Sequence, residues 1–384
     1  MEATINKKEK NISIEILRIV SMLMIIVLHF FSYTNATENL QVFSIKYFAN
    51  VLIITLCNVS VNCYILISGY FGLKSKFKLK KVFELSLEVL FYSIIIYVIL
   101  LKKNMIQFDF KELLVNFFPI LTRQYWFMTS FIGLYLITPY LKLVIQRFTK
   151  QEYMRFLIVL FALLVVYYNL FFFCDNLNFG GATGIVWFSY MYLWGMYFDK
   201  YGKIDYTKKH LKRYIICYIL LISTRLPFWI LYILTKNNIF IKGASIFDSV
   251  YNSIGVTIFS FITFNMFLNI RIKPNRIKVS MINFLARGSL AVYLIHDNKY
   301  IRNILWEKLN IRDCSWIKMI FILIGVILGI YLICSIIDWF RRKIFGLLFC
   351  NDKTENFINK IENKIKHKIY LIEGKVEKWT QSKI

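Results

Sequence analysis

The chain has 384 residues, of which 58% are hydrophobic and 18% are aromatic, and its formal net charge is +26. The apolar residues fall in blocks of roughly 18–25, the length that a helix needs to cross about 30 Å of hydrocarbon, which excludes a soluble protein. The basic residues lie in the short connections between these blocks. Their charge therefore indicates membrane topology, and it does not predict a nucleic-acid partner.

The apolar blocks predict an all-α, polytopic membrane protein with about ten transmembrane helices. The expected spans cover residues 13–34, 45–71, 83–101, 125–145, 155–173, 184–199, 213–234, 246–268, 283–301 and 316–340. We expect residues 1–345 to form a single transmembrane domain. The even number of spans places both ends of the chain on the same side of the membrane.

Connections rich in positive charge alternate with connections poor in it. A missed or an extra span would disturb this alternation, so it supports the count of ten spans. The connections rich in lysine and arginine are residues 72–82, 142–155, 200–213 and 271–278. By contrast, residues 35–44 and 174–183 contain neither lysine nor arginine. Basic connections face the cytoplasm, so we predict that both termini are cytoplasmic. The first block lacks a small-residue cleavage site and is expected to remain as a span rather than to be removed as a signal peptide.

Residues 346–384 differ in character from the rest of the chain. Ile361, Ile365, Ile369 and Ile372 recur at intervals of three and four, with lysines between them. This spacing predicts a basic amphipathic helix in the cytoplasm, lying on the anionic lipid surface. A coiled coil between copies of the chain is the alternative.

The first span carries two polar residues, Arg18 and His29, eleven positions apart. Eleven residues turn a helix by about 1,100°, so both side chains project from one face, about 16 Å apart along the axis. An arginine within hydrocarbon costs several kcal/mol unless it faces a cavity or a partner. The stripe therefore predicts a polar channel. The alternative is an arginine that reaches the interface and a histidine that bonds a neighbouring helix.

Further motifs follow in a fixed order along the chain. They are Ser68–Gly69–Tyr70–Phe71 before the basic run that ends at Lys81, then Tyr125–Trp126–Phe127, and Ser289–Leu290–Ala291–Val292–Tyr293–Leu294–Ile295–His296–Asp297. Together with the Arg-x10-His pair, these motifs resemble the acyltransferase-3 family of membrane O-acyltransferases over residues 10 to 340. The resemblance implies ten spans in a bacterial cell membrane. It also implies transfer of an acetyl group, or another short acyl group, from cytoplasmic acetyl-CoA to a hydroxyl of a surface polysaccharide or of its lipid-linked precursor.

The resemblance assigns roles to individual residues. It makes His29 the general base, for which the ordinary pKa of histidine is suited, or the carrier of a covalent acyl group. Arg18 is expected to bind the donor or to fix the geometry of the site. Many members carry Arg-x-x-Arg after the second span, where this chain has Lys78 and Lys81, which keep the charge but lose the bidentate fork. We expect Lys78, Lys80 and Lys81 to bind the phosphates of CoA, unless they serve only as topology signals.

Three further residues are candidates for substrate binding. Trp126 is suited to stack on a sugar or on adenine, although aromatic residues are also common at the membrane interface. His296 lies toward the outer end of the ninth span, on the acceptor side, where we expect it either to bind the acceptor or to support another site residue from behind. Arg225 lies within the seventh span and must face either a cavity or a carboxylate. The four histidines are scattered, so we predict no metal site.

Two other classes of protein remain as alternatives. A polysaccharide flippase would be expected to show repeated halves, and a polymerase a large outer loop; the sequence has neither signal. A channel or sensor without chemistry is disfavoured only by the Arg18–His29 stripe. As partners we expect acyl-CoA, the glycan acceptor and membrane lipids. Transfer is either direct, or completed by a separate extracytoplasmic protein or within a homo-oligomer.

Overall fold

The computed structural model describes residues 2–34, 36, 40–170, 181–202, 209–270, 272, 275–309, 311, 314–349, 360 and 364. Over this part of the chain the structure consists of helices joined by short connections, without a strand. This confirms the predicted all-α class. Almost all of the predicted tail, residues 346–384, lies outside the described residues.

The helices follow one another closely along the chain. In order they are α1 (Glu2–Tyr33), α2 (Ile45–Cys57), α3 (Ser60–Gly72), α4 (Leu79–Lys102), α5 (Phe110–Phe117), α6 (Trp126–Arg147), α7 (Lys150–Phe161), a π-helical turn (Ala162–Tyr167), α8 (Tyr168–Leu170), a 3-10 turn (Gly181–Thr183), α9 (Ile185–Tyr201), α10 (Lys209–Ser223), α11 (Leu226–Thr235), α12 (Asn238–Gly243), α13 (Ile254–Leu268), α14 (Arg276–His296), α15 (Lys299–Glu307) and α16 (Trp316–Phe349).

Eight of the ten predicted spans correspond to helices, or to pairs of consecutive helices, that are long and apolar enough to cross a membrane. The other two are shorter: α9 has 17 residues and α13 has 15. A 15-residue helix is only about 22 Å long, less than the hydrocarbon thickness. Both helices bury much of their surface against other helices. The described residues thus form a polytopic membrane protein with eight long spans and two short internal helices.

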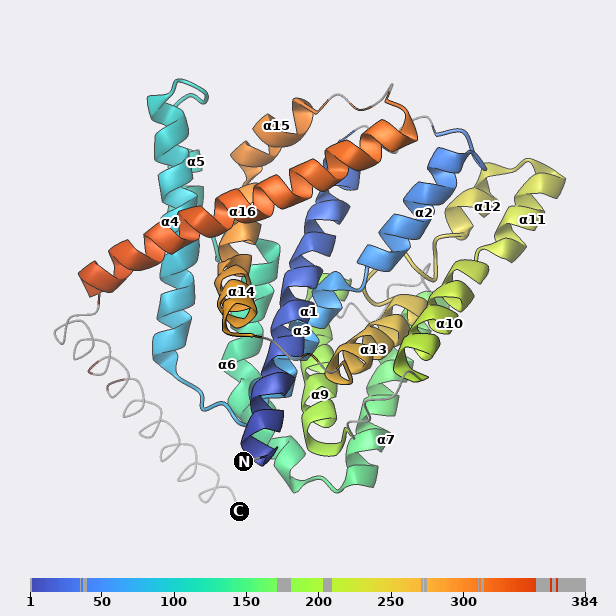
Figure 1. The fold of residues 1–384 in the computed structure, drawn as a ribbon, viewed down its shortest axis with the longest axis horizontal. Helices are drawn as coiled ribbons and strands as arrows, with labels where there is room; N and C mark the ends of the chain where they lie inside the picture. The colour runs from blue at the N-terminus through green and yellow to red at the C-terminus, as the bar shows by residue number, and fades with distance from the viewer. Residues whose placement is uncertain are drawn as a thin grey trace, which may run out of the picture.

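Helix α1 lies in the middle of the bundle, between α14 and the α2–α3 pair (Figure 1). It also packs against α13, α15 and α16. This position explains why Ile14, Leu17, Ile26 and Phe30 are completely buried. The central place of α1 brings its polar stripe against residues from distant parts of the chain.

Helices α3 and α9 approach each other closely because both carry glycine at the crossing. A Cβ atom on Gly69 would lie 2.1 Å from the carbonyl oxygen of Tyr192, and one on Gly195 would lie 2.4 Å from that of Leu66. Small residues allow this close packing in membranes, where van der Waals contact drives helix association. Of this pair, α3 lines the cavity described below.

The second and the seventh predicted spans are each divided into two helices, α2 and α3, and α10 and α11. One buried residue, Asp248, is hydrogen-bonded to residues at both divisions. Asp248 accepts hydrogen bonds from Thr55 Oγ1 (2.7 Å) near the end of α2, and its carbonyl accepts one from Asn58 Nδ2 (2.5 Å) between α2 and α3. Arg225, between α10 and α11, donates from Nε (2.8 Å) and Nη2 (2.7 Å) to the same carboxylate. Of the two surroundings expected for Arg225, the structure shows the carboxylate.

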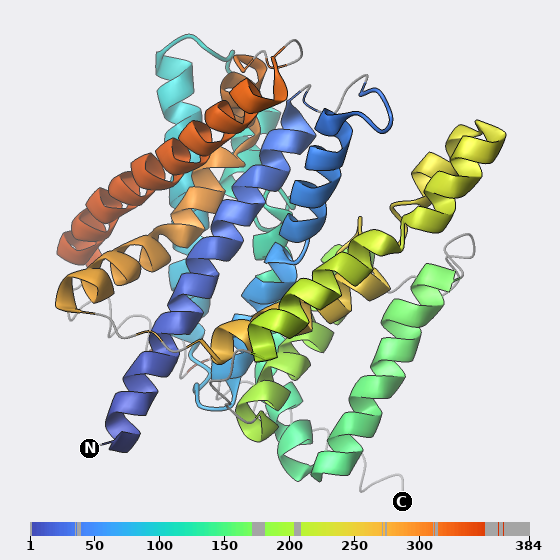
Figure 2. The same ribbon diagram turned by 45° about the vertical axis from the view of Figure 1, so that its right-hand side comes forward.

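The ninth predicted span, residues 283–301, is also interrupted. Helix α14 ends at His296, and α15 begins at Lys299 with Asn298 as its N-cap, whose Oδ1 accepts from the backbone N–H of Tyr300 (3.1 Å). Helices α11 and α12 project away from the bundle, as Figure 2 shows. The break after His296 matters most for function, because it lies beside the end of the polar stripe on α1.

Candidate functional site

A cavity of about 310 Å³ lies along α1, enclosed by α3, α4, α6, α14 and the segment that precedes α13. Arg18 and His29 both line it, as expected for two residues on one face of a helix. Between them on the same helix lie Met22, Ile25 and Leu28, which also line the cavity. The structure therefore places the polar stripe on a cavity with an apolar middle section.

His29 contacts a second histidine at the end of α14. Its Nδ1 lies 2.9 Å from Nε2 of His296, and Nδ1 of His296 contacts the carbonyl oxygen of Val292. The rings are tilted by 42°, with centroids 5.0 Å apart. His29 keeps 17% of its side chain exposed, whereas His296 is 1% exposed and does not line the cavity. His296 therefore lies behind His29 and does not itself line the cavity.

An ion pair flanks the two histidines. Asp297 Oδ1 lies 3.7 Å from His29 Nδ1 and 3.0 Å from Arg302 Nη2. Tyr33 donates from its hydroxyl to the same oxygen (3.3 Å), and the guanidinium of Arg302 lies over the Tyr33 ring, 4.5 Å from its centroid. Asp297 places a negative charge next to His29, and Arg302 balances that charge.

Three cationic side chains line the cavity: Arg18, Lys81 and Arg287. Arg18 Nη1 lies 2.7 Å from Glu15 Oε2, one turn earlier on α1, and the hydroxyl of Tyr64 donates to the Arg18 carbonyl (3.0 Å). Of the three lysines expected to bind CoA, Lys81 lines the cavity and Lys78 and Lys80 do not. The positive charge of the cavity thus comes from α1, α4 and α14 together.

A family model described as an acyltransferase domain, that of the acyltransferase-3 family, matches residues 11–339. The chain belongs to the acyltransferase-3 family. No curated protein and no solved structure matches it. The family and the long apolar helices together show a multi-pass membrane acyltransferase.

In this acyltransferase-3 protein, Trp126 also lines the cavity, as its assignment to substrate binding requires. Its indole stacks on the ring of Tyr251, with centroids 6.1 Å apart and planes inclined by 18°. Tyr251 lines the cavity too, from the irregular segment before α13. Arg225 is held by Asp248 and does not line the cavity, so its geometry favours a structural role.

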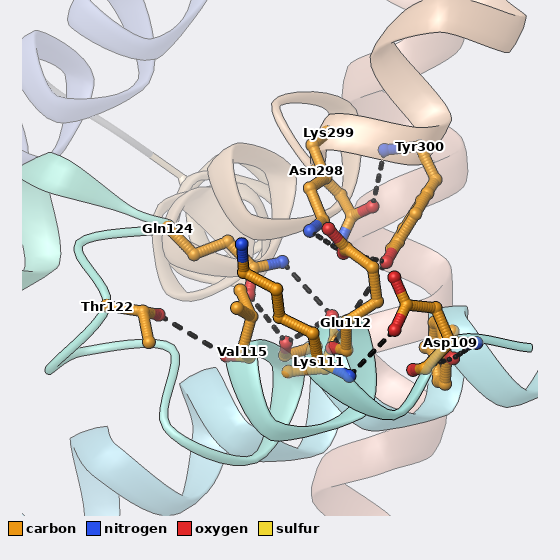
Figure 3. A network of polar contacts seen from close by, with 12 residues as sticks. Asp109, Lys111, Glu112, Val115, Thr122, Gln124, Asn298, Lys299 and Tyr300 are labelled. Atoms are coloured by element: carbon orange, nitrogen blue, oxygen red, sulfur yellow. Dashed lines mark hydrogen bonds and ion pairs between the residues drawn. The ribbon is translucent and has the colours of Figure 1, made fainter.

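A polar network holds the junction that carries His296 and Asp297. Figure 3 shows Glu112 of α5 beside Lys299 and Tyr300 of α15. The hydroxyl of Tyr300 donates to Glu112 Oε2 (2.7 Å), and Lys299 pairs with the same oxygen. These hydrogen bonds hold the pKa of the Glu112 carboxyl below its usual value. Asn298 Nδ2 donates to the hydroxyl of Tyr125 at 2.8 Å, which ties the junction to α6 as well.

Four of the residues that line the cavity were predicted from the sequence: Arg18, His29, Lys81 and Trp126. Arg287 lines the cavity and was not among the predicted site residues. An arginine at that depth is itself a signal of a polar cavity. The acidic partner Asp297 follows His296 directly, but its proximity to His29 depends on how α1 packs against α14. Among the described residues, no cluster of three or more histidine, cysteine or acidic side chains could hold a metal ion.

Proposed function

We propose that this chain is an O-acyltransferase of a bacterial cell membrane. It takes an acetyl group, or another short acyl group, from cytoplasmic acetyl-CoA. It places the group on a hydroxyl of a surface polysaccharide or of the lipid-linked precursor of that polysaccharide. The observation that carries the proposal is a cavity lined both by His29 and by the cationic side chains of Arg18, Lys81 and Arg287.

The cationic residues are suited to the donor. The phosphates of CoA are strong acceptors for charge-assisted hydrogen bonds, and an arginine provides two parallel ones. Arg18 and His29 are about 16 Å apart along α1. An extended pantetheine arm is long enough to cover most of this gap, so a donor held by Arg18 would bring its thioester near His29.

His29 is suited to the proton transfer. As the acceptor hydroxyl attacks the carbonyl carbon of the thioester, the histidine takes the hydroxyl proton and an O–C bond forms. The C–S bond then breaks, and the proton passes from the histidine to the departing sulfur of CoA. In a two-step variant the same nitrogen attacks the thioester first and carries the acyl group. Trp126 and Tyr251 offer aromatic surface on which the acceptor sugar would rest.

The test uses purified protein in nanodiscs with radiolabelled acetyl-CoA. We expect wild-type protein to release CoA and to label a glycan acceptor, and His29→Ala to lower the rate about 10²- to 10⁴-fold, the contribution of a general base. His210→Gln is the control, because His210 bonds Asn265 and does not line the cavity. Label retained on wild-type protein would indicate an acyl-histidine. Protein that neither binds nor turns over acetyl-CoA would overturn the proposal and direct attention to transport of lipid-linked sugars.

A further inference from the structure

The contact between His29 and His296 fixes where protons lie on both rings. His29 comes from α1 and His296 from the end of α14, 267 positions later. Each neutral imidazole has one N–H donor and one acceptor nitrogen, and a carbonyl oxygen can only accept. Each contact of the two rings therefore needs one donor and one acceptor, and the assignment at one nitrogen determines the assignment at the next.

The assignment of donors and acceptors begins at Val292, whose carbonyl oxygen contacts Nδ1 of His296. This nitrogen must carry the hydrogen. A neutral His296 then has a lone pair on Nε2, which accepts a hydrogen bond from Nδ1–H of His29 over 2.9 Å. In turn, a neutral His29 with its hydrogen on Nδ1 has its lone pair on Nε2. Nε2 is the ring nitrogen of His29 that does not contact His296, so it is available to groups in the cavity.

A protonated His296 would reverse this arrangement, because both its nitrogens would donate. Burial opposes that state, since His296 is 1% exposed and an ionised group away from water is costly. Asp297 is the nearby carboxylate, and it already pairs with Arg302 and accepts from Tyr33. The geometry therefore favours the neutral ring at position 296.

We infer that His296 is a positioning residue that holds His29 in the Nδ1–H form, so that Nε2 presents its lone pair to the reacting groups. When Nε2 takes up a proton, Nδ1–H still donates to His296, and Asp297 lies 3.7 Å from the new positive charge. In the other neutral tautomer of His29, the hydrogen is on Nε2. That nitrogen could then neither accept a proton nor attack a carbonyl. The catalytic consequence rests on the proposed function, while the proton positions do not.

Glutamine and methionine at position 296 give a matched pair. The two side chains have the same length, but only glutamine ends in a carbonyl oxygen that can accept from His29. We expect His296→Gln to keep its rate within about tenfold of wild type, and His296→Met to lose about 10²-fold or more, the scale of general-base catalysis. The KM for acetyl-CoA and the melting temperature should be alike in the two variants. Equal rates for both variants would overturn the inference.

Nitrogen NMR on protein labelled with 15N-histidine gives a readout that does not need turnover. His29→Gln protein identifies the His29 signals by their loss. In wild type at neutral pH we expect the Nδ1 of His29 to show the shift of a protonated nitrogen and Nε2 that of a bare one, and the pattern to change in His296→Met. A protonated Nε2 in wild type would overturn the inference even if acyl transfer is observed. The expected shifts without any turnover of acetyl-CoA would uphold it and overturn the proposed function alone.

Discussion

Arginine and lysine differ in what they offer a phosphate, and this bears on the three cations of the cavity. Hydrogen bonds to charged groups contribute about 1.5–3 kcal/mol each, which corresponds to roughly 10- to 100-fold in affinity. Arg18→Ala and Arg287→Ala should each weaken CoA binding by about tenfold or more. Arg18→Lys should recover only part of the loss, because it lacks the fork. Calorimetric titration with CoA measures these effects.

The control is Lys212→Ala, which removes an exposed charge from α10, away from the cavity. It should bind CoA as wild type does. If Lys212→Ala weakens binding as much as Arg18→Ala, a diffuse positive surface attracts the donor and the cavity cations have no special role.

Asp248 provides a test of the buried ion pair with Arg225. Removing one partner of such a pair leaves an uncompensated buried charge and costs about 3–5 kcal/mol. Asp248→Asn should therefore lower the melting temperature in nanodiscs strongly, and the double change Arg225→Met with Asp248→Leu should restore much of the loss. A double variant no more stable than Asp248→Asn would show that the hydrogen bond from Thr55 to the carboxylate, rather than charge balance, sets the stability.

The residues on one helix could be placed from sequence, because helix geometry is local. Arg18 and His29 were assigned to one face by their spacing, and both line the cavity. The partners of His29 and Arg225 could not be found in this way. His296 is 267 positions from His29, and Asp248 lies in an irregular segment 23 positions after Arg225. No pattern in the sequence specifies which distant segments pack together.

At the scale of helices, the crossing of α3 and α9 depends on glycine. Adding a methyl group at Gly195 would force the backbones apart, and overpacking of this kind costs about 1–3 kcal/mol. Gly195→Ala should lower the melting temperature, whereas Gly329→Ala on α16 should not, because nothing lies within 4 Å of a Cβ there. Equal effects of the two changes would mean that helix propensity, and not close packing, decides the outcome.

The joint between α5 and α15 depends on the charge of Glu112. Because its pKa is lowered in the folded protein, the carboxylate stabilises the fold at pH values above its unfolded pKa, about 4.3, and this stabilisation is lost as the pH falls through the lower folded value. Wild type should therefore melt higher than Glu112→Gln at neutral pH. The difference should shrink as the pH falls below about 4.3 and vanish once the pH is below the folded pKa of Glu112. A difference that does not change with pH would contradict an ionic role for Glu112.

The breaks in the helices could not be predicted from hydropathy. The second span reads as one apolar block, yet α2 ends at Cys57 and α3 begins at Ser60. The cause is polar: Asn58 turns to the carbonyl of Asp248. The ninth span is interrupted in the same way at Asn298, which caps α15 and reaches Tyr125. Asparagine alone does not mark such a break, because Asn50 and Asn62 of the second span lie within α2 and α3.

At the scale of the whole molecule, the orientation in the membrane stays a prediction. The alternation of charge predicts that residues 72–82 lie inside and the connection before α5 outside. In a cysteine-free background, Gln107→Cys should react with a membrane-impermeant maleimide in intact cells. Lys76→Cys should react only after permeabilisation. The reverse pattern would invert the topology and place His29 nearer the cytoplasm than Arg18.

The apolar middle of the cavity has a consequence for the cell that is separate from catalysis. Met22, Ile25, Leu28, Val61 and Leu85 line the cavity and carry no polar group that could replace the hydration shell of an ion. Apolar lining of this kind makes the passage of an ion unfavourable. An uncharged acyl group on a thin pantetheine arm could cross a stretch that a proton or a sodium ion cannot. Under the proposed function, acyl groups would then reach the outer side without short-circuiting the electrochemical gradient of the membrane.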